Sequence, residues 1–355
     1  MSPPQGDYLE AVRSSCRALT ENGPVKVSAD GIRSFLKNLD KHRFEELSVD
    51  TPIRMPLKFD TLAEELNFVA LIDLLNFGSG YRVPLHELAG RGAFDTIRFG
   101  AMSFHIGGTP MDAATFKSMT AFKVSEIFQF PIDREVKPKD MPFITMTEPT
   151  ELKQLADGIT TVLNTTGEFL EQHKYNDLAA FILDLTKPVA NQKPSASKLV
   201  EHLTKALPGL RDISEINGRP VYVLKKAQIL VYHLWMFFRD QEPDRFDFAD
   251  IDNLTVFADN VVPTLLVHLG VLEIPESWQA DITDGQDLGE IRATTLRAAS
   301  IVACEDIVEL VKQNASVSAV THMNEGHLDV YLWRLGKEGD YRKIPRFALR
   351  DTVMF

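Results

Sequence analysis

Apolar positions recur at helical spacing along most of the chain. Leu62, Leu66, Val69, Ile72 and Leu75 are separated by three or four residues, which places them on one face of a helix. The same spacing predicts helices over residues 8–19, 31–39, 152–172 and 291–313, and another that begins after Ser195 and stops at Pro208-Gly209. The pattern therefore predicts a mainly α protein.

One segment departs from the helical pattern. In residues 213–223, Asn217-Gly218 separates two short alternating runs, which is the usual signal for a two-residue hairpin turn. Residues 131–142 and 184–197 are the best candidate loops, but neither is long or polar enough for a linker between domains. We therefore expect a single domain over residues 1–355, with a small β-hairpin among the helices.

The helix over residues 62–75 ends abruptly in the sequence NFGSGY. Gly78 and Gly80 can adopt the positive backbone angles that end a helix, which leaves Asn76, Phe77 and Tyr81 around a short loop. The local sequence allows two interpretations, a plain helix stop with an aromatic plug or a loop that presents Asn76 and Phe77 to a ligand.

Composition and charge exclude several classes of protein. Hydrophobic residues make up 44% of the chain and charged residues 25%, as in ordinary globular proteins. The formal net charge of -12 argues against electrostatic binding to DNA or RNA, because such binding needs clustered Lys and Arg that neutralise many phosphates. Cys16 and Cys304, the only cysteines, cannot build a disulfide framework or a Cys-rich zinc site.

The sequence also indicates a location. The first residues lack a basic segment followed by an apolar run, and no apolar stretch reaches the roughly 20 residues that span a bilayer. We expect no membrane association and a reducing compartment, so the predicted location is cytoplasmic, with the nucleus as an alternative.

Familiar catalytic signatures are missing from the sequence. It contains no GxxxxGK loop, no HExxH and no GxSxG, and the nine histidines are scattered. We therefore do not expect metal catalysis. Cys304 falls on the apolar face of a predicted helix, where burial makes a thiol unreactive.

Carboxylates beside aromatic residues remain as candidate chemistry. Phe257 and Asp259 precede an apolar helix that Gly270 ends, and Asp329 opens a short run with Tyr331 and Trp333. Each aspartate could simply cap a helix. Together with the rings they also suit a flat heterocycle on a sugar, since a charged carboxylate stabilises the oxocarbenium-like transition state of glycosidic cleavage.

Two lysines follow the predicted hairpin. Lys225 and Lys226 could form a solvated pair at the start of a helix, and we expect this of at least one of them. The other could contact a phosphate.

Taken together, these motifs resemble the queuosine salvage proteins, a family of queuosine 5′-phosphate N-glycosylases. The resemblance is carried, in family order, by DLLNFGSGY, LNTTG, INGRPVYVLKKAQILV, TVFADNVVPTLLVHLGVL, EIRA, LDVYLW and the ending IPRFALRDTVMF. It implies a helical domain related to helix-hairpin-helix DNA glycosylases that acts, without a metal or cofactor, on a nucleotide. The implied reaction is hydrolysis of the N-glycosidic bond of queuosine 5′-monophosphate, which releases queuine for reinsertion into tRNA.

The resemblance also implies site residues. Asp329 and Asp259 would share the catalytic and ligand-anchoring roles in an order that the sequence leaves open, and Lys225 would face the 5′-phosphate. The substrate-binding set would comprise Asn76, Phe77, Tyr81, Lys225, His233, Phe257, Tyr331 and Trp333. We expect a monomer with a small-molecule substrate and no direct contact with nucleic acid.

Three positions depart from the family pattern. His233 stands where an Asp is expected, Asn260-Val261 where Tyr-Arg is familiar, and Gly-Ser-Gly-Tyr where a second Phe and a Trp are usual. They raise an alternative from another class, a non-catalytic protein that binds queuine or a related nucleotide. A DNA-repair glycosylase is a third hypothesis, which the acidic charge disfavours.

Overall fold

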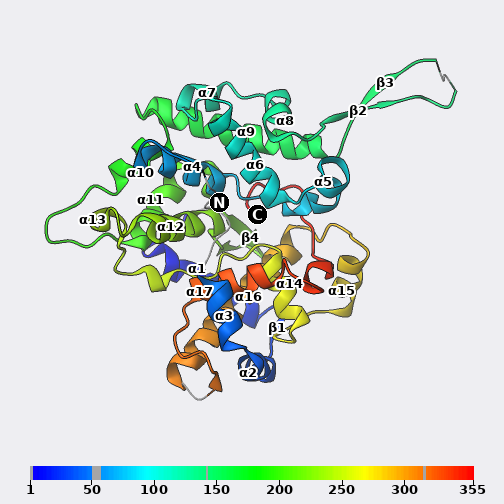
Figure 1. The fold of residues 1–355 in the computed structure, drawn as a ribbon. Helices are drawn as coiled ribbons and strands as arrows, with labels where there is room; N and C mark the ends of the chain where they lie inside the picture. Colours follow the sequence, from blue (N-terminus) through cyan, green and yellow to red (C-terminus); the bar gives the residue numbers. More distant parts are fainter. Residues whose placement is uncertain (1–2, 50–56, 141–142, 315–316) are drawn as a thin grey trace. The chain divides into compact units, whose positions relative to one another are not determined.

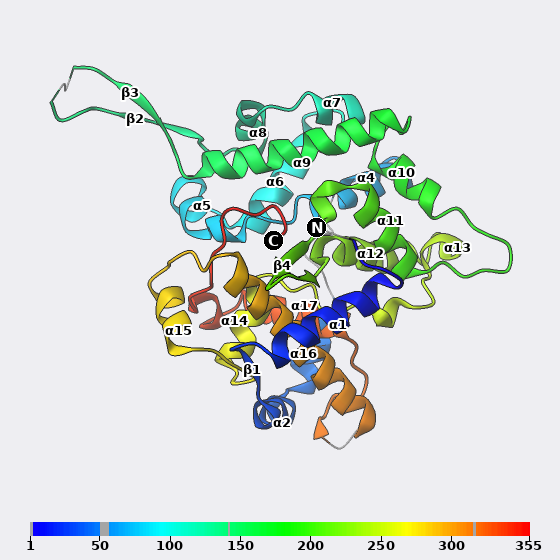
Figure 2. The ribbon, with the colours of Figure 1, turned by 180° about the vertical axis from the view of Figure 1, so that it is seen from behind.

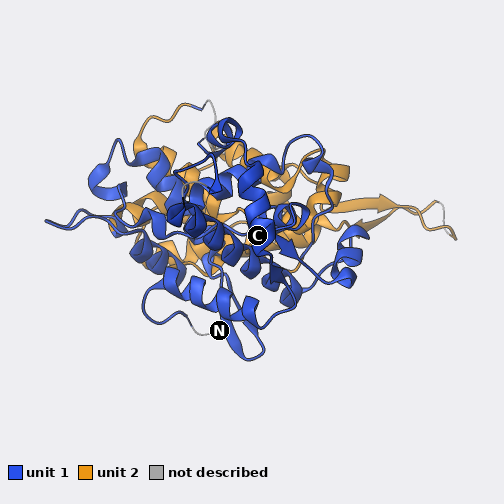
Figure 3. Cartoon of the chain, turned by 90° about the horizontal axis from the view of Figure 1, so that it is seen from below, with its two compact units in different colours: residues 1–57, 185–205, 210–349 blue, residues 58–184, 206–209, 350–355 orange. Residues whose placement is uncertain are grey.

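The computed structural model describes residues 3–49, 57–140, 143–314 and 317–355. The prediction of a mainly α protein is confirmed, because helices dominate and the strands are short antiparallel pairs. The chain forms two compact units, coloured separately in Figure 3. Unit 1 contains residues 1–57, 185–205 and 210–349, and unit 2 contains residues 58–184, 206–209 and 350–355. A single domain over residues 1–355 and the relation to helix-hairpin-helix glycosylases stay predictions.

Unit 1 holds helices α1 to α3 and, further along the chain, helices α11 to α17, most of which Figure 1 labels. Its elements are α1 (Tyr8–Glu21), β1 (Lys26–Val27), α2 (Ala29–Asn38), α3 (Lys41–Ser48), α11 (Ala196–Ala206), β4 (Ile213–Ile216), β5 (Arg219–Tyr222), α12 (Lys225–Phe238), α13 (Pro243–Phe246), η3 (Ile251–Asn253), α14 (Val261–His268), β6 (Leu272–Glu273), α15 (Glu276–Thr283), α16 (Glu290–Gln313), α17 (Glu325–Leu335) and η5 (Tyr341–Lys343).

Helix α16 forms the centre of unit 1. It packs against α1, α14 and α17, and Figure 2 shows α1 lying along it. Such a helix must be apolar on most of its surface, and residues 293–304 are all buried.

The predicted hairpin is confirmed in unit 1. Strands β4 and β5 pair antiparallel with Ile216 opposite Arg219, and Asn217 and Gly218 between them have φ angles of 53° and 73°. Two positive φ angles in succession match the right-handed twist of the paired strands. Leu224 then adopts a φ of 52°, which turns the chain from the hairpin into α12.

Unit 2 contains α4 to α9 and the exposed ribbon β2–β3, which Figure 1 shows extending away from the helices of this unit. Its elements are α4 (Leu62–Leu74), η1 (Ser79–Tyr81), α5 (Arg82–Ala89), α6 (Ala93–Ile106), α7 (Ala113–Lys117), α8 (Ala121–Phe128), β2 (Asp133–Val136), β3 (Met146–Pro149), α9 (Leu152–Gln172), α10 (Leu178–Leu185) and η2 (Pro208–Leu210). The last residues of α10 and η2, Leu185 and Leu210, already belong to unit 1.

Two local predictions for unit 2 need correction. The candidate loop over residues 131–142 contains β2, because its alternating residues pair with residues 146–149, and its last two residues lie outside the described part of the chain. Helix α4 ends at Leu74 with Leu75 as its C-cap, before the glycines, and of Gly78 and Gly80 only Gly78 has a positive φ, 96°. The candidate loop over residues 184–197 is confirmed between α10 and α11.

A glycine sets the distance between α2 and the end of α14 in unit 1. A Cβ atom on Gly31 would lie 1.9 Å from the carbonyl oxygen of Gly270, so an alanine requires the backbone to move. We predict that Gly31→Ala lowers the free energy of unfolding by about 1–3 kcal/mol in urea titrations. Ser34→Ala, on the exposed side of α2, is the control and should change it by less than about 0.5 kcal/mol. Equal stabilities of the two variants would contradict the close approach.

Candidate active site

A buried segment without regular structure, residues 254–260, lies between η3 and α14 in unit 1. Such a segment has no ladder of its own, so its backbone polar groups need partners from elsewhere. Gln228 of α12 supplies the first, because its Oε1 accepts a hydrogen bond from the Thr255 amide at 2.9 Å. Its Nε2 donates to the carbonyl of Val223 at 2.9 Å, which ties the segment to the exit of the hairpin.

Asp329 holds the middle of this segment. Asp329 lies within α17, and its side chain is buried. Its Oδ1 accepts a hydrogen bond from the Phe257 amide at 2.7 Å. The helix-capping interpretation of Asp329 is wrong, because α17 begins four residues earlier and Asn324 caps it.

Burial, followed by the charge of Asp259, raises the pKa of Asp329 to about 8. The hydrogen bond from Phe257 and the charge of Lys225 act in the opposite direction. Asp329 is therefore mainly protonated at neutral pH, and its carboxyl group can donate a hydrogen bond.

Asp259 lies near the C-terminal end of the segment, just before α14 begins. Its Oδ1 accepts hydrogen bonds from the amides of Val261 at 2.6 Å and Val262 at 3.3 Å, so the helix-capping interpretation is confirmed for this aspartate. The positive end of the helix dipole attracts the carboxylate. Both bonds use Oδ1, so capping is compatible with a second role for Asp259.

A buried ion pair links the start of α12 to the buried segment. Arg297 of α16 donates from Nη1 to Asp212 Oδ1 at 3.0 Å and from Nη2 to Asp212 Oδ2 at 2.5 Å, and both side chains are buried. The Nε of Arg297 donates to the carbonyl of Ala258 at 2.7 Å, while Asp212 Oδ2 accepts from the Lys225 amide at 3.1 Å. The start of α12 and the buried segment are thus bonded to one pair of side chains.

Lys225 and Lys226 are both buried, so the prediction that at least one is solvated is wrong. Burial lowers the pKa of Lys225 to about 8, although the charges of Asp259, Asp212 and Asp329 act to raise it. Burial and the charge of Lys225 lower the pKa of Lys226 well below its ordinary value. Lys225 therefore lies in the electrostatic field of both candidate aspartates.

The aromatic candidates of unit 1 do not form one cluster. Phe257 is buried with its ring centroid 5.4 Å from that of Tyr232. Tyr331 lies two residues beyond Asp329, on the opposite side of α17, and its ring packs against Phe44 of α3 at 5.1 Å. Trp333 shares the Asp329 side of the helix by spacing, is partly exposed, and has the Lys337 ammonium 4.0 Å from its ring centroid.

His233 is buried and stacks on Phe237 one turn later in α12, with ring centroids 5.6 Å apart. By helical spacing it lies on the same side as Lys226, whereas Gln228 and Tyr232 lie on the side that meets the buried segment. Its predicted role in ligand binding stays a prediction.

Asn76, Phe77 and Tyr81 belong to unit 2. The Tyr81 hydroxyl donates to the carbonyl of Arg350 at 2.9 Å, and the Phe77 ring lies against α9, where a Cβ on Gly158 would be 3.5 Å from it. Phe77 and Tyr81 are buried and Asn76 is partly exposed. These contacts favour the aromatic-plug interpretation for Phe77 and Tyr81, and the ligand roles of all three stay predictions.

Sequence reasoning missed the side chains that hold the buried segment, namely Gln228, Asp212 and Arg297. Arg297 had a visible signal, because a charged residue stands at a position that the helical spacing of residues 291–313 assigns to the core. Asp212 and Gln228 had none, since their partners are distant in sequence.

Further features of the chain are its possible metal ligands, its two thiols and the length of its apolar helices. Within residues 3–49, 57–140, 143–314 and 317–355, no group of three or more His, Cys, Asp or Glu side chains could hold a metal ion. Both cysteines are buried free thiols, and burial raises the pKa of Cys304 well above its ordinary value. In the same part of the chain, no helix combines the length and apolar character needed to cross a bilayer.

The fold and the site thus define a mainly helical protein in which two buried aspartates and an aromatic ring attach to one irregular segment. Comparison with known families gives the particular family. The model of the queuosine salvage protein family matches residues 99–352, more than half of the chain, so the chain belongs to this family. The match includes every candidate residue of unit 1, whereas Asn76, Phe77 and Tyr81 precede it.

Curated relatives carry the same name across distant organisms. A queuosine 5′-phosphate N-glycosylase/hydrolase of Schizosaccharomyces pombe is 28% identical over 77% of this chain and 75% of its own length. Its namesake in Nematostella vectensis is 30% identical over 62% of this chain and 65% of its own length. The one in Mus musculus is 29% identical over 52% of this chain and 54% of its own length, so the matched share varies among relatives.

The raised pKa of Asp329 predicts how stability depends on pH. The folded protein holds a proton on Asp329 up to about pH 8, whereas the unfolded chain releases it near the ordinary value of 3.8. This contribution is fully present below 3.8 and is lost as pH rises through about 8. The lowered pKa of Lys225 acts oppositely, but only between about 8 and its ordinary 10.5.

We therefore predict that Asp329→Asn removes part of the pH dependence of stability. From about pH 5 to about pH 7, the wild type should lose on the order of 1 kcal/mol per pH unit relative to this variant in urea unfolding. Asp340→Asn, which changes an exposed carboxylate, is the control and should keep the wild-type slope. A wild-type slope in Asp329→Asn would show that Asp329 is ionised in the folded protein.

Proposed function

We propose that this protein hydrolyses the N-glycosidic bond of queuosine 5′-monophosphate and releases queuine. Membership of the queuosine salvage family and the names of the relatives support this function. The structural observation that carries it is that both aspartates attach to one buried segment: Asp329 accepts a hydrogen bond from the Phe257 amide, and Asp259, two residues later, accepts from the first amides of α14.

The environments of the two aspartates suit different roles. In the reaction, the bond between C1′ and the base nitrogen breaks, the sugar develops positive charge, and the oxygen of a water molecule bonds to C1′. Asp259, held at a helix N-terminus, is the carboxylate that stabilises the developing cation or accepts the proton of the water. Asp329, protonated at neutral pH, is the group that donates a hydrogen bond or a proton to the departing base.

Phe257 lies two residues before Asp259 on the same buried segment. Its amide is bonded to Asp329, so the position of its ring depends on that carboxyl group. We assign it the wall on which the base stacks, because an aromatic face suits a flat heterocycle. The predicted roles of Asn76, Tyr81, Tyr331, Trp333 and His233 remain weaker, since their described contacts are with other parts of the protein core or with neighbouring side chains.

The structure favours a different role for Lys225 than a phosphate contact. Its charge interacts with Asp259, Asp212 and Asp329, and these carboxylates would repel a phosphate brought close to the ammonium. We assign Lys225 as the counter-ion of the aspartates at this site.

His233 supports a second candidate function. A buried histidine stacked on Phe237 occupies the position where the family resemblance predicts a carboxylate. Loss of that carboxylate would leave a protein that binds queuine or its nucleotide without cleaving it.

Partners and location follow from the same proposal. A free nucleotide is the substrate, and the net charge of -12 disfavours direct binding to nucleic acid. We propose a monomer in a reducing compartment, the cytoplasm, in which the two buried thiols remain reduced.

Incubation of the purified protein with queuosine 5′-monophosphate, followed by chromatography, tests the activity. We predict that the wild type releases queuine and that Asp259→Asn and Asp329→Asn each lower kcat by about a hundredfold or more. Asp340→Asn, in an exposed position, is the control and should retain wild-type kcat. No release by the wild type, together with a rise in Tm on adding queuine, would replace the enzyme by the binding protein.

Comparison of the nucleotide with the nucleoside tests the role of Lys225. As a counter-ion, Lys225→Met should lower kcat for queuosine 5′-monophosphate and for queuosine by the same factor, about tenfold or more. A phosphate contact predicts instead a selective increase in KM for the nucleotide. Steady-state kinetics with both substrates distinguishes the two results.

A further inference from the structure

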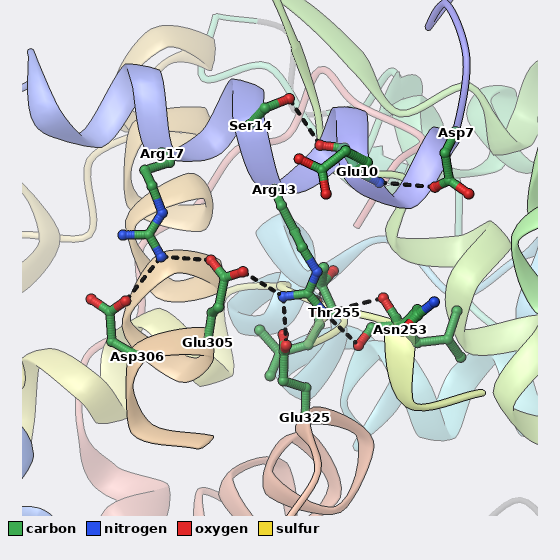
Figure 4. Close-up of polar contacts among 12 residues, drawn as sticks. Asp7, Glu10, Arg13, Ser14, Arg17, Asn253, Thr255, Glu305, Asp306 and Glu325 are labelled. Carbon is green, nitrogen blue, oxygen red and sulfur yellow. Dashed lines mark hydrogen bonds and ion pairs between the residues drawn. The ribbon is translucent and has the colours of Figure 1, made fainter. Parts of the chain in front are cut away.

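Arg13 of α1 binds the entry of the buried segment, as Figure 4 shows. Its Nη2 donates to the carbonyl of Asn253 at 3.1 Å and more weakly to that of Leu254 at 3.4 Å. Its Nη1 contacts Glu325 Oε1 at 2.6 Å and Glu305 Oε1 at 2.9 Å. One guanidinium thus connects two acidic side chains with the backbone that leads to Phe257 and Asp259.

Glu325 links this arginine to α17. It is the first residue of the helix and is 4% exposed, and it lies one turn before Asp329 on the same buried side. Its Oε2 is buried without a hydrogen-bond partner of normal geometry. Burial raises the pKa of Glu325 to about 7 despite the neighbouring Arg13. Removal of a carboxylate from water costs free energy of folding, and apolar residues of similar volume could often fill the same space without this cost. The presence of Glu325 here therefore needs an explanation beyond stability.

We propose that Arg13 and Glu325 are positioning residues for the buried segment, and through it for Phe257 and Asp259. The inference deepens the proposed function and rests on it. Gln228 and Asp329 fix the amides of residues 255 and 257, and Arg297 fixes the carbonyl of residue 258. Arg13 fixes the carbonyls at the entry, so the pair completes the attachment of the segment at its N-terminal end.

The alternative is an ion pair that only stabilises the fold. A double variant separates the two roles, because replacement of both members of a buried pair by apolar residues is often neutral or stabilising. Arg13→Met combined with Glu325→Leu removes both charges and also the hydrogen bonds to the segment. If the pair serves stability alone, this variant regains normal activity once it is folded.

Helix α1 offers a matched control. Arg17 lies one turn beyond Arg13 and belongs to the same network, but its hydrogen bonds go to Glu305 at 2.6 Å and Asp306 at 2.9 Å. Arg17→Met therefore removes the same kind of side chain from the same helix and leaves the bonds to residues 253 and 254 in place.

The experiment compares the full-length wild type, the double variant and Arg17→Met by three measurements. Urea unfolding gives the stability of each protein, hydrogen–deuterium exchange follows the amides of residues 254–260, and kinetics with queuosine 5′-monophosphate gives kcat and KM. All kinetics are run well below the Tm of each protein, so that each sample is fully folded.

We expect the double variant to be about as stable as the wild type, to exchange the amides of the segment at least about tenfold faster, and to lose about tenfold or more in kcat. Arg17→Met should match the wild type within about twofold in exchange and in kcat. Wild-type exchange in a folded double variant overturns the proposal, as does wild-type kcat.

If the wild type itself releases no queuine, the proposed function fails while the exchange measurement still tests the positioning. Faster exchange of the segment in the double variant alone would then support the positioning. Equal exchange in all three proteins would contradict it.

Discussion

The buried ion pair between Asp212 and Arg297 is the interaction on which the candidate site depends. Both charges are removed from water, a cost that only good geometry and further hydrogen bonds can offset. Here the bonds are two between the side chains, one from the Lys225 amide and one to the Ala258 carbonyl. Because the start of α12 and the end of the buried segment share this pair, Lys225 and Asp259 are brought into each other's field.

Burial, followed by neighbouring charge, then raises the pKa of Asp329. With Asp212 paired to Arg297, the remaining groups are Lys225, Asp259 and Asp329 in surroundings of low polarity. Two ionised carboxylates beside one ammonium would leave a net negative charge, and protonation of Asp329 removes it. The raised pKa of Asp329 thus follows from burial and neighbouring charge, a means by which enzymes obtain an acid from an aspartate.

The sequence predicts local features well, because local rules produce them. Helix α9 has the predicted bounds, the turn at Asn217-Gly218 forms, and Asp259 caps α14. Features that depend on distant partners were missed or wrong. Periodicity cannot show that Gln228 bonds to Thr255, nor that Tyr331 packs on Phe44 of α3 and so faces away from Asp329. Lys225 and Lys226 were misjudged for the same reason, since only the tertiary structure supplies the carboxylates that accompany their burial.

An irregular segment at a site must be held by side chains, and this ties stability to chemistry. A strand or helix satisfies its own backbone, whereas residues 254–260 donate amide hydrogen bonds to side chains of α12 and α17 and accept one from a side chain of α16. One of those groups, Asp329, is also a candidate catalytic carboxyl group, so the same atoms orient Phe257 and determine the proton at the site. A change in its protonation therefore alters the acceptor of the Phe257 amide. The position of Phe257 and the proton held at this site consequently depend on a single group.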